Sequence, residues 1–392
     1  MNKKLGLAVA GALLAAASSA NAGITIPAGD WTVDLGGNVN AYYTHTNFSG
    51  ALSKTSTNEI GTGLLPAALG IGAKTRQNDL DIAVQFTFFT GTSSGPAASS
   101  ALGGFNSNGA NGGGGANTLN IRQAYMTFGD ASWGTIKGGR DLGVYGSDAI
   151  LSDMTLLGVG NGAGGSGSST LGRIGSGYVY ADWVGQFSYT SPNFNGFQVT
   201  GAVREPWTNG ADTTNSNVGW EGKATYDFAA NDVTGRVWVG GITQKHDASG
   251  LTPGYTSKGW DVGAKASYAG AQLVGYYYGG SGLAGPSTVL NGVPFLGGTD
   301  ADVSGGYVQA TFVIPGVGTK VGASWGESMV AGTTAGSAEF KSESWIIGAY
   351  HPLTKSLNLV AEYTDNKQDN LLNVNGANGK ARTAALGAIL FF

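Results

Sequence analysis

The sequence predicts an all-β fold, a 16-stranded antiparallel up-and-down transmembrane β-barrel. Three observations predict it: a composition rich in glycine and aromatic residues, many segments of alternating apolar and polar residues, and connections that alternate between long and short. Glycine supplies 69 of the 392 residues, without the Gly-X-Y period of collagen. The 16 tyrosines, 15 phenylalanines and nine tryptophans argue against a disordered chain.

Alternation of apolar and polar residues marks sixteen candidate strands along the chain. Most run nine to twelve residues, the length with which a tilted strand crosses a bilayer. In order, the predicted strands are 31–45, 63–75, 79–90, 119–128, 133–140, 177–190, 196–204, 219–228, 233–244, 259–268, 271–279, 304–314, 319–326, 343–351, 357–364 and 383–392. Each segment alone is a weak signal.

The connections between these segments are stronger evidence, because eight long ones alternate with seven short ones without a break. The long connections are 46–62, 91–118, 141–176, 205–218, 245–258, 280–303, 327–342 and 365–382. The short ones include residues 76–78 and the tight turn at Gly270. A soluble sandwich has no reason to sort loop length in this way. An up-and-down barrel does so when its loops lie at one end and its turns at the other.

The side chains along single strands agree with a barrel wall. Leu80, Ile82, Val84, Phe86 and Phe88 fall on one face of a strand, and Asp79, Asp81, Gln85 and Thr87 fall on the other. A wall between lipid and a wet interior requires this segregation, although a half-buried soluble strand shows it too. Aromatic clusters near strand ends are typical of interfacial girdles. These clusters are Tyr42–Tyr43, Phe88–Phe89, Tyr276–Tyr278 and Phe391–Phe392.

The first 22 residues have the pattern of a secretory signal peptide. Lys3 and Lys4 precede a thirteen-residue apolar segment, 5–17, and Ala20-Asn21-Ala22 gives a small-residue cleavage site. We therefore predict a signal peptide at 1–22 and a barrel domain at 23–392. The rest of the chain has no apolar run of about 18 residues, so no transmembrane helix is predicted.

Composition and motifs argue against several functional classes. The chain has no cysteine, and 21 basic residues less Lys3 and Lys4 leave 19 against 25 acidic ones, which does not favour a nucleic-acid partner. His45, His246 and His351 do not converge in the strand order, and no metalloprotease or nucleophile-elbow motif is present. The G-x-G-x-x-G at 162–167 lacks a βαβ unit and is interpreted as a loop. We predict no enzyme activity, no metal site and no cofactor.

Several ordered motifs resemble the general porins of Gram-negative outer membranes, the trimeric 16-stranded type. The segments 189–197 (YTSPNFNGF) and 350–356 (YHPLTKS) resemble turns of that family, and 122–140 resembles the strand pair before its third loop. The C-terminal strand, with Leu390 and the terminal Phe392, resembles the strand that the barrel-assembly machinery recognises. The resemblance spans essentially the whole chain after residue 22.

The resemblance implies long external loops, short periplasmic turns and an inward-folded third loop, which narrows a water-filled lumen. That loop is the connection at 141–176 here. Acidic side chains on it face basic ones and create a transverse field. Carried over by motif, the acidic side is Asp148 and Asp153, and the basic side is Arg122 and Arg173. Arg140 also matches a family arginine, with a subunit contact as its alternative role.

The resemblance further implies an outer-membrane channel for passive diffusion of ions and small hydrophilic solutes. The implied partners are two further copies in a homotrimer, outer-membrane lipid including lipopolysaccharide, and the barrel-assembly machinery. The connection 91–118 occupies the position of the family's contact to a neighbouring subunit, and its small side chains predict a weak latch. A solute-specific channel and a non-conducting surface barrel or adhesin remain as alternatives.

Three departures from the family pattern predict a weaker transverse field. The chain has Ala68 where the family has arginine, Asn38 where lysine is expected, and Thr155-Leu-Leu-Gly158 where the family has Pro-Glu-Phe-Gly. Two basic residues and one carboxylate are thereby lost. The sequence leaves the choice between cations and anions open.

Overall fold

A computed structural model describes residues 23–52, 55–91, 119–162, 169–207, 217–248, 253–283, 300–331, 338–370 and 376–392. The predicted signal peptide and most of the connection 91–118 lie outside these ranges, so the cleavage site and the subunit latch stay predictions. Among the described residues, no helix is long and apolar enough to span a bilayer.

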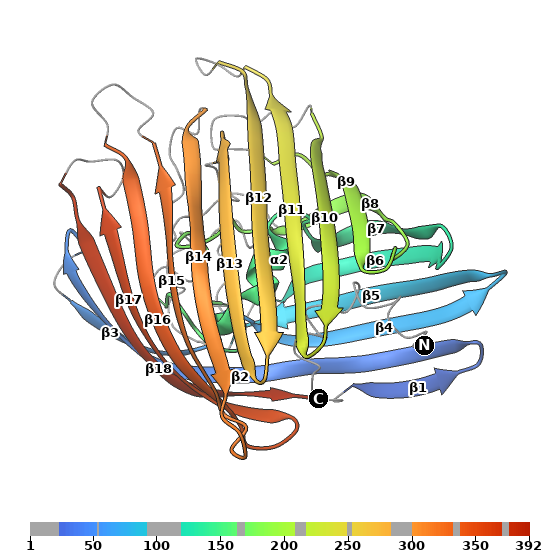
Figure 1. The fold of residues 1–392 in the computed structure, drawn as a ribbon, viewed down its shortest axis with the longest axis horizontal. Helices are drawn as coiled ribbons and strands as arrows, with labels where there is room; N and C mark the ends of the chain where they lie inside the picture. Colours follow the sequence, from blue (N-terminus) through green and yellow to red (C-terminus); the bar gives the residue numbers. More distant parts are fainter. Residues whose placement is uncertain are drawn as a thin grey trace.

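Sixteen strands of the described chain close into one antiparallel barrel (Figure 1). They are β2 (Trp31–Gly50), β4 (Ala67–Gln77), β5 (Leu80–Thr90), β6 (Asn120–Asp130), β7 (Gly134–Leu142), β8 (Trp183–Thr190), β9 (Phe197–Arg204), β10 (Gly219–Ala230), β11 (Val233–His246), β12 (Tyr255–Tyr268), β13 (Ala271–Ser281), β14 (Asp302–Val313), β15 (Lys320–Val330), β16 (Phe340–Pro352), β17 (Leu357–Asp369) and β18 (Gly379–Phe391). Each pairs with its two neighbours, and β18 pairs with β2 to close the ring. All sixteen predicted strands are confirmed.

Two short strands, β1 (Ile24–Ala28) and β3 (Ser56–Gly61), were not predicted, and both pair with the twenty-residue β2. β3 lies in the segment predicted as a long connection. β3 and β4 pair with the same edge of β2, and residues 62–66 separate the two strands along the chain. There the backbone N–H of Leu64 donates to the carbonyl of Gly158 at 2.8 Å, so the chain pairs with a distant loop.

The tight turns contain residues in the left-handed region of backbone space. Asn78 and Asp79 have φ of 47° and 64°, and Ala269 and Gly270 have φ of 47° and 84°. Positive φ at both central residues is the geometry of the two-residue hairpin turn whose twist matches that of the strands. These turns hold β4 against β5 and β12 against β13.

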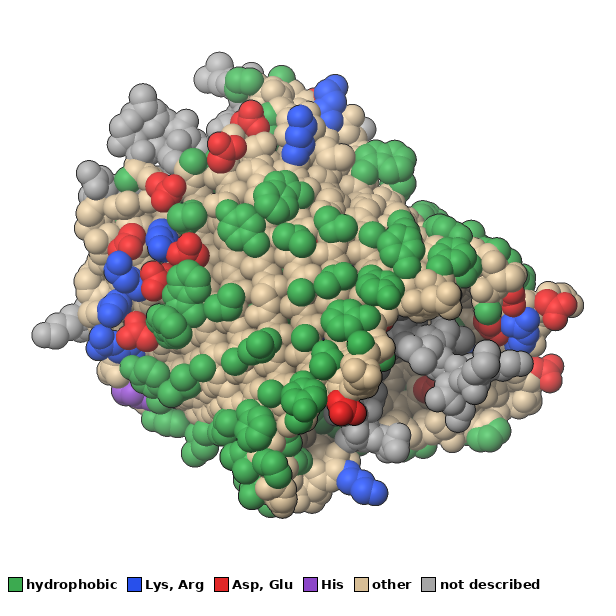
Figure 2. All heavy atoms as spheres, viewed as in Figure 1, with side chains coloured by type: hydrophobic (Ala, Val, Ile, Leu, Met, Phe, Trp, Pro, Cys, Tyr) green, Lys and Arg blue, Asp and Glu red, His purple; other side chains and the backbone are tan. Residues whose placement is uncertain are grey.

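The wall has an apolar outer face and a largely polar inner face. On β5, Phe86 is 47% exposed on the outside, whereas its neighbour Thr87 is fully buried on the inside. Figure 2 shows apolar side chains spread over the outer face of the long strands, with charged side chains gathered at the edge formed by β16–β18. The segregation predicted from the sequence of β5 is therefore confirmed.

The aromatic clusters divide between the two faces, because successive side chains of a strand point in opposite directions. Tyr277 is exposed on the outer face, whereas Tyr276 and Tyr278 are buried inside. Likewise, Tyr43 points outward and Tyr42 inward. The interpretation of these clusters as interfacial girdles is therefore wrong for their buried members, which are Tyr42, Phe89, Tyr276, Tyr278 and Phe391.

Candidate functional site

The connection between β7 and β8 lies inside the barrel. It runs from residue 143 to 182, slightly later than the predicted 141–176, and contains the helix α2 (Ser147–Ser152) and the 3-10 helix η2 (Met154–Leu157). In Figure 1, α2 lies behind the strands β10–β13. Hydrogen bonds to strands on several sides of the ring hold the connection in this position.

Two carboxylates of the wall hold the start of this connection. Glu221 on β10 accepts hydrogen bonds from the backbone N–H groups of Val144 and Tyr145, the latter at 3.1 Å. Asp261 on β12 accepts one from the N–H of Gly146 at 3.2 Å. Hydrogen bonds between ionised acceptors and backbone N–H groups are among the stronger ones in proteins. The turn before α2 is therefore fastened to two strands.

A third carboxylate holds the far side of the connection. Glu362 on β17 accepts hydrogen bonds from the backbone N–H groups of Val159 and Gly160, at 2.8 and 2.7 Å. Its other carboxylate oxygen accepts one from the hydroxyl of Tyr350 at 2.6 Å. A Cβ atom at Gly158 would lie only 2.0 Å from this carboxylate, so a larger residue there would displace the carboxylate from its present position.

Uncharged side chains fasten the helical segment between these anchors. The amide of Gln309 on β14 donates to the carbonyl of Ser152 at 2.9 Å and accepts from the N–H of Met154 at 2.7 Å. The hydroxyl of Tyr307 donates to the carbonyl of Ala149 at 2.8 Å. The connection thus contacts β10, β12, β14 and β17, which lie around much of the ring.

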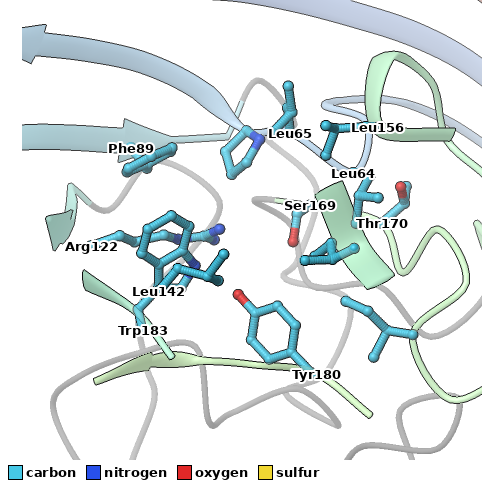
Figure 3. A pocket seen from close by; sticks show the side chains of 13 residues that line it. Leu64, Leu65, Phe89, Arg122, Leu142, Leu156, Ser169, Thr170, Tyr180 and Trp183 are labelled. Atoms are coloured by element: carbon cyan, nitrogen blue, oxygen red, sulfur yellow. The ribbon is translucent and has the colours of Figure 1, made fainter. Parts of the chain in front are cut away.

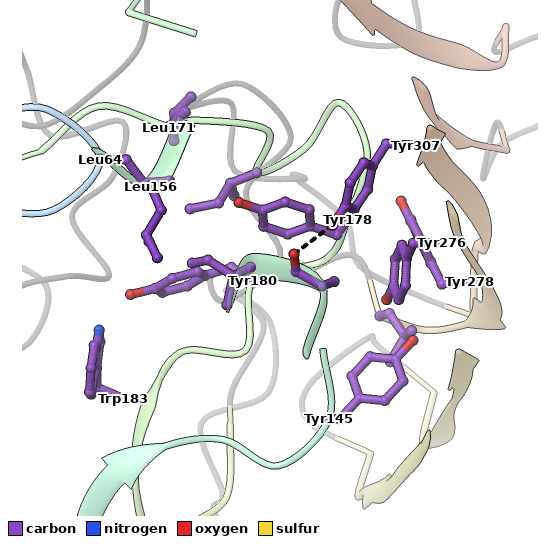
Figure 4. Close-up of a cluster of buried hydrophobic side chains, with 14 of the residues drawn as sticks. Leu64, Tyr145, Leu156, Leu171, Tyr178, Tyr180, Trp183, Tyr276, Tyr278 and Tyr307 are labelled. Carbon is purple, nitrogen blue, oxygen red and sulfur yellow. Dashed lines mark hydrogen bonds between the residues drawn. The ribbon is translucent and has the colours of Figure 1, made fainter. Parts of the chain in front are cut away.

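Apolar packing fills the space between the connection and the wall (Figure 4). The ring of Tyr178, in the connection, packs edge to face against the ring of Tyr307 on β14, and the ring centres are 5.9 Å apart. Tyr307 also meets Tyr276 at 5.8 Å, and Trp238 stacks on Tyr276. Aromatic pairs in such geometries stabilise a contact beyond the area that they bury. These rings therefore help to hold the connection rather than forming an open aromatic surface.

Asp148, in the first turn of α2, pairs with two bases of the wall. One carboxylate oxygen lies 2.6 Å from Nζ of Lys223 on β10, and the other lies 3.0 Å from Nη1 of Arg236 on β11. Burial opposes the charged form, but the attraction of Lys223 and Arg236 outweighs it and lowers the pKa of Asp148 to about 2. Asp148 is therefore ionised at neutral pH.

Asp153 is buried and organises the connection itself. Its carboxylate accepts hydrogen bonds from the backbone N–H of Thr155 at 2.9 Å, from the N–H of Arg173 at 3.1 Å and from the hydroxyl of Tyr178 at 2.8 Å. It thereby caps η2 and joins the outgoing and returning parts of the chain.

Arg173 lies in the connection rather than on a strand, and it is fully buried. Its guanidinium donates to the hydroxyl of Ser344 on β16 at 3.1 Å and to the hydroxyl of Ser324 on β15. Burial lowers the pKa of Arg173 to about 10, against the opposing attraction of Asp153. The group stays charged at neutral pH and fixes the returning chain to the wall.

Arg122 and Arg140 lie near the other side of the barrel. The guanidinium of Arg122 lies 5.1 Å from the ring centre of Phe89, and Figure 3 shows both beside Trp183 at a small cavity. The cavity has a volume of about 20 Å³, room for about one water molecule. Arg140 on β7 lies 3.9 Å from Glu205. The predicted set is therefore dispersed: only Asp153 and Arg173 contact each other.

The anchoring residues Glu221, Asp261, Glu362 and Gln309, and the bases Lys223 and Arg236, were not predicted. Their signal in the sequence is a polar residue at an inward position of a strand whose neighbours are apolar. Glu362, between Ala361 and the outward Tyr363, is an example. The pattern identifies such residues as inward-facing, but their partners on the connection lie more than 70 residues away in the chain.

The C-terminus completes the ring. The carbonyl of Phe392 accepts a hydrogen bond from the N–H of Gly37 at 2.9 Å, and the N–H of Phe392 donates back to Gly37 at 3.1 Å. Leu390 pairs with Leu357 on one side and Val39 on the other, and its side chain is exposed on the outer face. The last residues therefore belong to the closing strand.

The three histidines lie on three different strands. His45 is on β2, His246 on β11 and His351 on β16, and each has its own hydrogen-bond partner. In the part of the chain that is described, no group of three or more His, Cys, Asp or Glu residues could hold a metal ion. The G-x-G-x-x-G motif at 162–167 lies largely outside the described residues.

This arrangement defines a class of protein: an outer-membrane β-barrel with an inward-folded loop. The Gram-negative porin family matches residues 7–371 of the chain. The chain therefore belongs to the Gram-negative porin family, whose members are non-enzymatic outer-membrane channels for passive diffusion.

Solved structures with the same fold cover nearly all of the chain. An anion-selective porin from Comamonas acidovorans is 17% identical, covers 92% of this chain and 100% of its own, and has a TM-score of 0.63. OmpF of Salmonella typhi, in complex with daunomycin, is 18% identical, with 94% and 100% covered and a TM-score of 0.60. OmpT of Vibrio cholerae, in a trimer form, is 14% identical, with 92% and 99% covered and a TM-score of 0.57. A comparison with curated proteins returned no significant match.

Proposed function

We propose that the connection between β7 and β8 forms the constriction of a general diffusion channel for ions and small hydrophilic solutes. One observation carries the proposal: the connection is fastened inside the barrel to β10, β12, β14 and β17. A segment fixed across the lumen narrows the water path, and its charged groups act on passing ions.

The five predicted constriction residues would contribute in different ways. Asp148 supplies charge to the lumen together with its two basic partners on the wall. Asp153 and Arg173, both buried, would act by keeping the connection in shape. Arg122 and Arg140 would set the charge where the connection leaves and rejoins the wall. For Arg140, beside Glu205, a contact between subunits remains the alternative.

Conductance in a planar bilayer tests the channel, and liposome swelling with sugars of increasing size tests its generality. A general channel is expected to pass small sugars at rates that fall smoothly with size. Saturation by one sugar would favour a solute-specific channel. If correctly folded protein conducted no current in the bilayer, the result would favour a surface barrel or adhesin.

We infer a homotrimer as the assembled state, supported by the trimer form of the structurally similar OmpT. A stable trimer should migrate as an oligomer on a gel without boiling and as a monomer after boiling. A monomer band in unboiled samples extracted gently from membranes would contradict it.

The charged outer edge of β15–β18 supports a contact with the headgroups of the outer leaflet, including lipopolysaccharide. Lys341 lies 2.6 Å from Glu327, and Arg382 and Lys380 lie 2.9 and 3.7 Å from Asp365, all on the outer face. Charges on the outside of a transmembrane wall are tolerated only at headgroup level. Co-purification of lipopolysaccharide with wild-type protein, and its loss on replacing Lys380 and Arg382 by Gln, would test the contact.

The ends of the chain would serve export and assembly. Cleavage after Ala22 is expected from N-terminal sequencing of protein from the outer membrane, and an N-terminus at Met1 would contradict it. Because Leu390 and Phe392 end the closing strand, deleting Phe392 should lower the amount of folded barrel through poorer recognition by the assembly machinery. Normal yields would argue against this role.

A further inference from the structure

A groove crosses the outer face of the wall between β10 and β16, and it has a volume of about 570 Å³. Its floor is made by five small residues, Ala264, Ala266, Gly275, Ala310 and Ala323. Phe228 and Val237 lie at one end of it, and Trp325 and Trp345 lie at the other. In Figure 2, stretches of backbone are visible between the large apolar side chains of this face. We call this feature the outer groove.

The outer groove exists because small residues occupy outward positions on neighbouring strands. Gly275 on β13 lies between Ala264 on β12 and Val308 on β14. A Cβ atom at Gly275 would meet no atom of a non-adjacent residue within 4 Å, whereas Leu273, on the same face of the same strand, is 64% exposed. Atoms beside an unfilled void lose van der Waals contacts, so a flexible apolar chain that fills the groove stabilises this part of the wall.

The outer groove is continuous with the charged edge of β15–β18. One row of directly opposite residues runs across the strands, in the order Ala264, Gly275, Val308, Trp325, Trp345, Asp365 and Arg382. Ala264 lies four residues from the turn end of β12 at Tyr268, whereas Arg382 lies nine residues from the end of β18 at Phe391. Because the strands of a barrel are tilted, such a row climbs along the wall. The row therefore leads from the charged edge, near the loops, to the small residues nearer the turns.

Trp325 joins the groove to the charged edge. Its indole N–H donates a hydrogen bond to the carboxylate of Glu343 at 3.2 Å, while its ring lines the outer groove. The ring of Trp345 lies beside it, with the ring centres 6.2 Å apart. Tryptophan side chains with one apolar and one polar side mark the level at which hydrocarbon meets headgroups. A lipid whose headgroup lies at the charged edge therefore has its chains beside the opening of the groove.

We propose that the outer groove binds one acyl chain of a lipopolysaccharide molecule whose headgroup lies at the charged edge of β15–β18. The chain passes the two tryptophan rings and lies on the floor formed by Gly275 and its small neighbours. Lipid chains are as apolar as the wall, so this contact gains only van der Waals energy, and the headgroup supplies most of the affinity. The groove thus fixes the position of the lipid at this face of the barrel. The inference rests on the headgroup contact proposed above and adds the place where the chain lies.

Gly275→Leu tests the proposal, because a leucine side chain there fills the groove without displacing the wall. Gly201→Leu is the matched control, since Gly201 points outward from β9, beyond the groove, and a Cβ atom there also meets no atom of a non-adjacent residue within 4 Å. Binding of labelled lipopolysaccharide to each protein in detergent is measured by fluorescence anisotropy. The affinity should fall about twofold or more in Gly275→Leu and stay at the wild-type value in Gly201→Leu. With lipopolysaccharide whose acyl chains have been removed, Gly275→Leu and wild type should bind equally.

An equal affinity in Gly275→Leu and wild type, an equal fall in Gly201→Leu, or the same fall with the deacylated lipid would overturn the proposal. A changed oligomeric state on an unboiled gel with unchanged lipid affinity would also overturn it, because a second copy of the chain would then cover the groove. Wild-type affinity in a Lys380→Gln, Arg382→Gln double variant would instead contradict the headgroup contact, so the two failures are distinguishable. Folding of each variant is checked by heat-sensitive migration on a gel.

Discussion

At the scale of single residues, the structure gives two equally buried carboxylates of the connection different partners. Asp148 and Asp153 lie five residues apart, and both match the acidic side expected from the family resemblance. Asp148 pairs with wall bases, whereas Asp153 bonds only to its own connection. Sequence spacing cannot tell these roles apart, because each depends on which backbone N–H groups the fold brings near.

The ion pairs of Asp148 lead us to expect that the ion selectivity of the channel changes at low pH. Its pKa is lowered from the ordinary 3.8 to about 2, so its ion pairs are complete above about pH 4 and are lost as the pH falls towards 2. Protonation leaves Lys223 and Arg236 less compensated. The wild-type reversal potential should therefore shift towards chloride only at low pH.

Asp148→Asn should show this shift already at pH 7 and should lose the part of the acid transition that Asp148 supplies. Asp232→Asn, at an exposed turn, is the control and should behave like wild type. A full wild-type acid transition in Asp148→Asn would assign the titration to another group.

At the scale of elements, the strands can be predicted from the sequence, whereas the path of the connection between β7 and β8 cannot. Period-2 alternation is local, so it finds all sixteen wall strands even when their ends shift by a few residues. β3 was missed because Ser56–Gly61 is polar and pairs with β2 without an apolar face. The hydrogen bonds that fasten the connection join residues such as Gly160 and Glu362, and no local pattern contains such pairs.

Glu362→Ala is expected to loosen the connection. The change leaves the buried N–H groups of Val159 and Gly160 without their acceptor, at a cost of about 1–3 kcal/mol each. Single-channel recordings should show larger current noise and a raised mean conductance. Glu59→Ala, at an exposed position of β3, should leave the current unchanged. A quiet channel of wild-type conductance in Glu362→Ala would show that the other anchors suffice.

At the scale of the whole molecule, one sheet separates two environments and closes without a free edge. The terminal Phe392 bonds to Gly37, and β1 pairs with β2 just beyond that point, at Ile24–Leu35. The two ends of the described chain thus complete the same part of the wall. Closure satisfies the backbone groups of each strand, which is the condition for a sheet to exist in lipid. The outer face must then be apolar at mid-height, whatever the interior contains.

A pair of neighbouring substitutions on β13 tests this two-sided wall. Leu273 is 64% exposed on the outer face, and Gln272 beside it points to the lumen, where its amide donates to Ser267 at 3.0 Å. Leu273→Lys places a charge in lipid close to the turn at one end of the wall and should lower the free energy of unfolding by about 1–2 kcal/mol, since this cost falls from the bilayer midplane towards the interfaces. Gln272→Lys adds the same charge on the wet side and should cost about 1 kcal/mol or less. Urea unfolding of both variants in lipid vesicles measures the difference, and equal losses would mean that the two faces of β13 are not in different solvents.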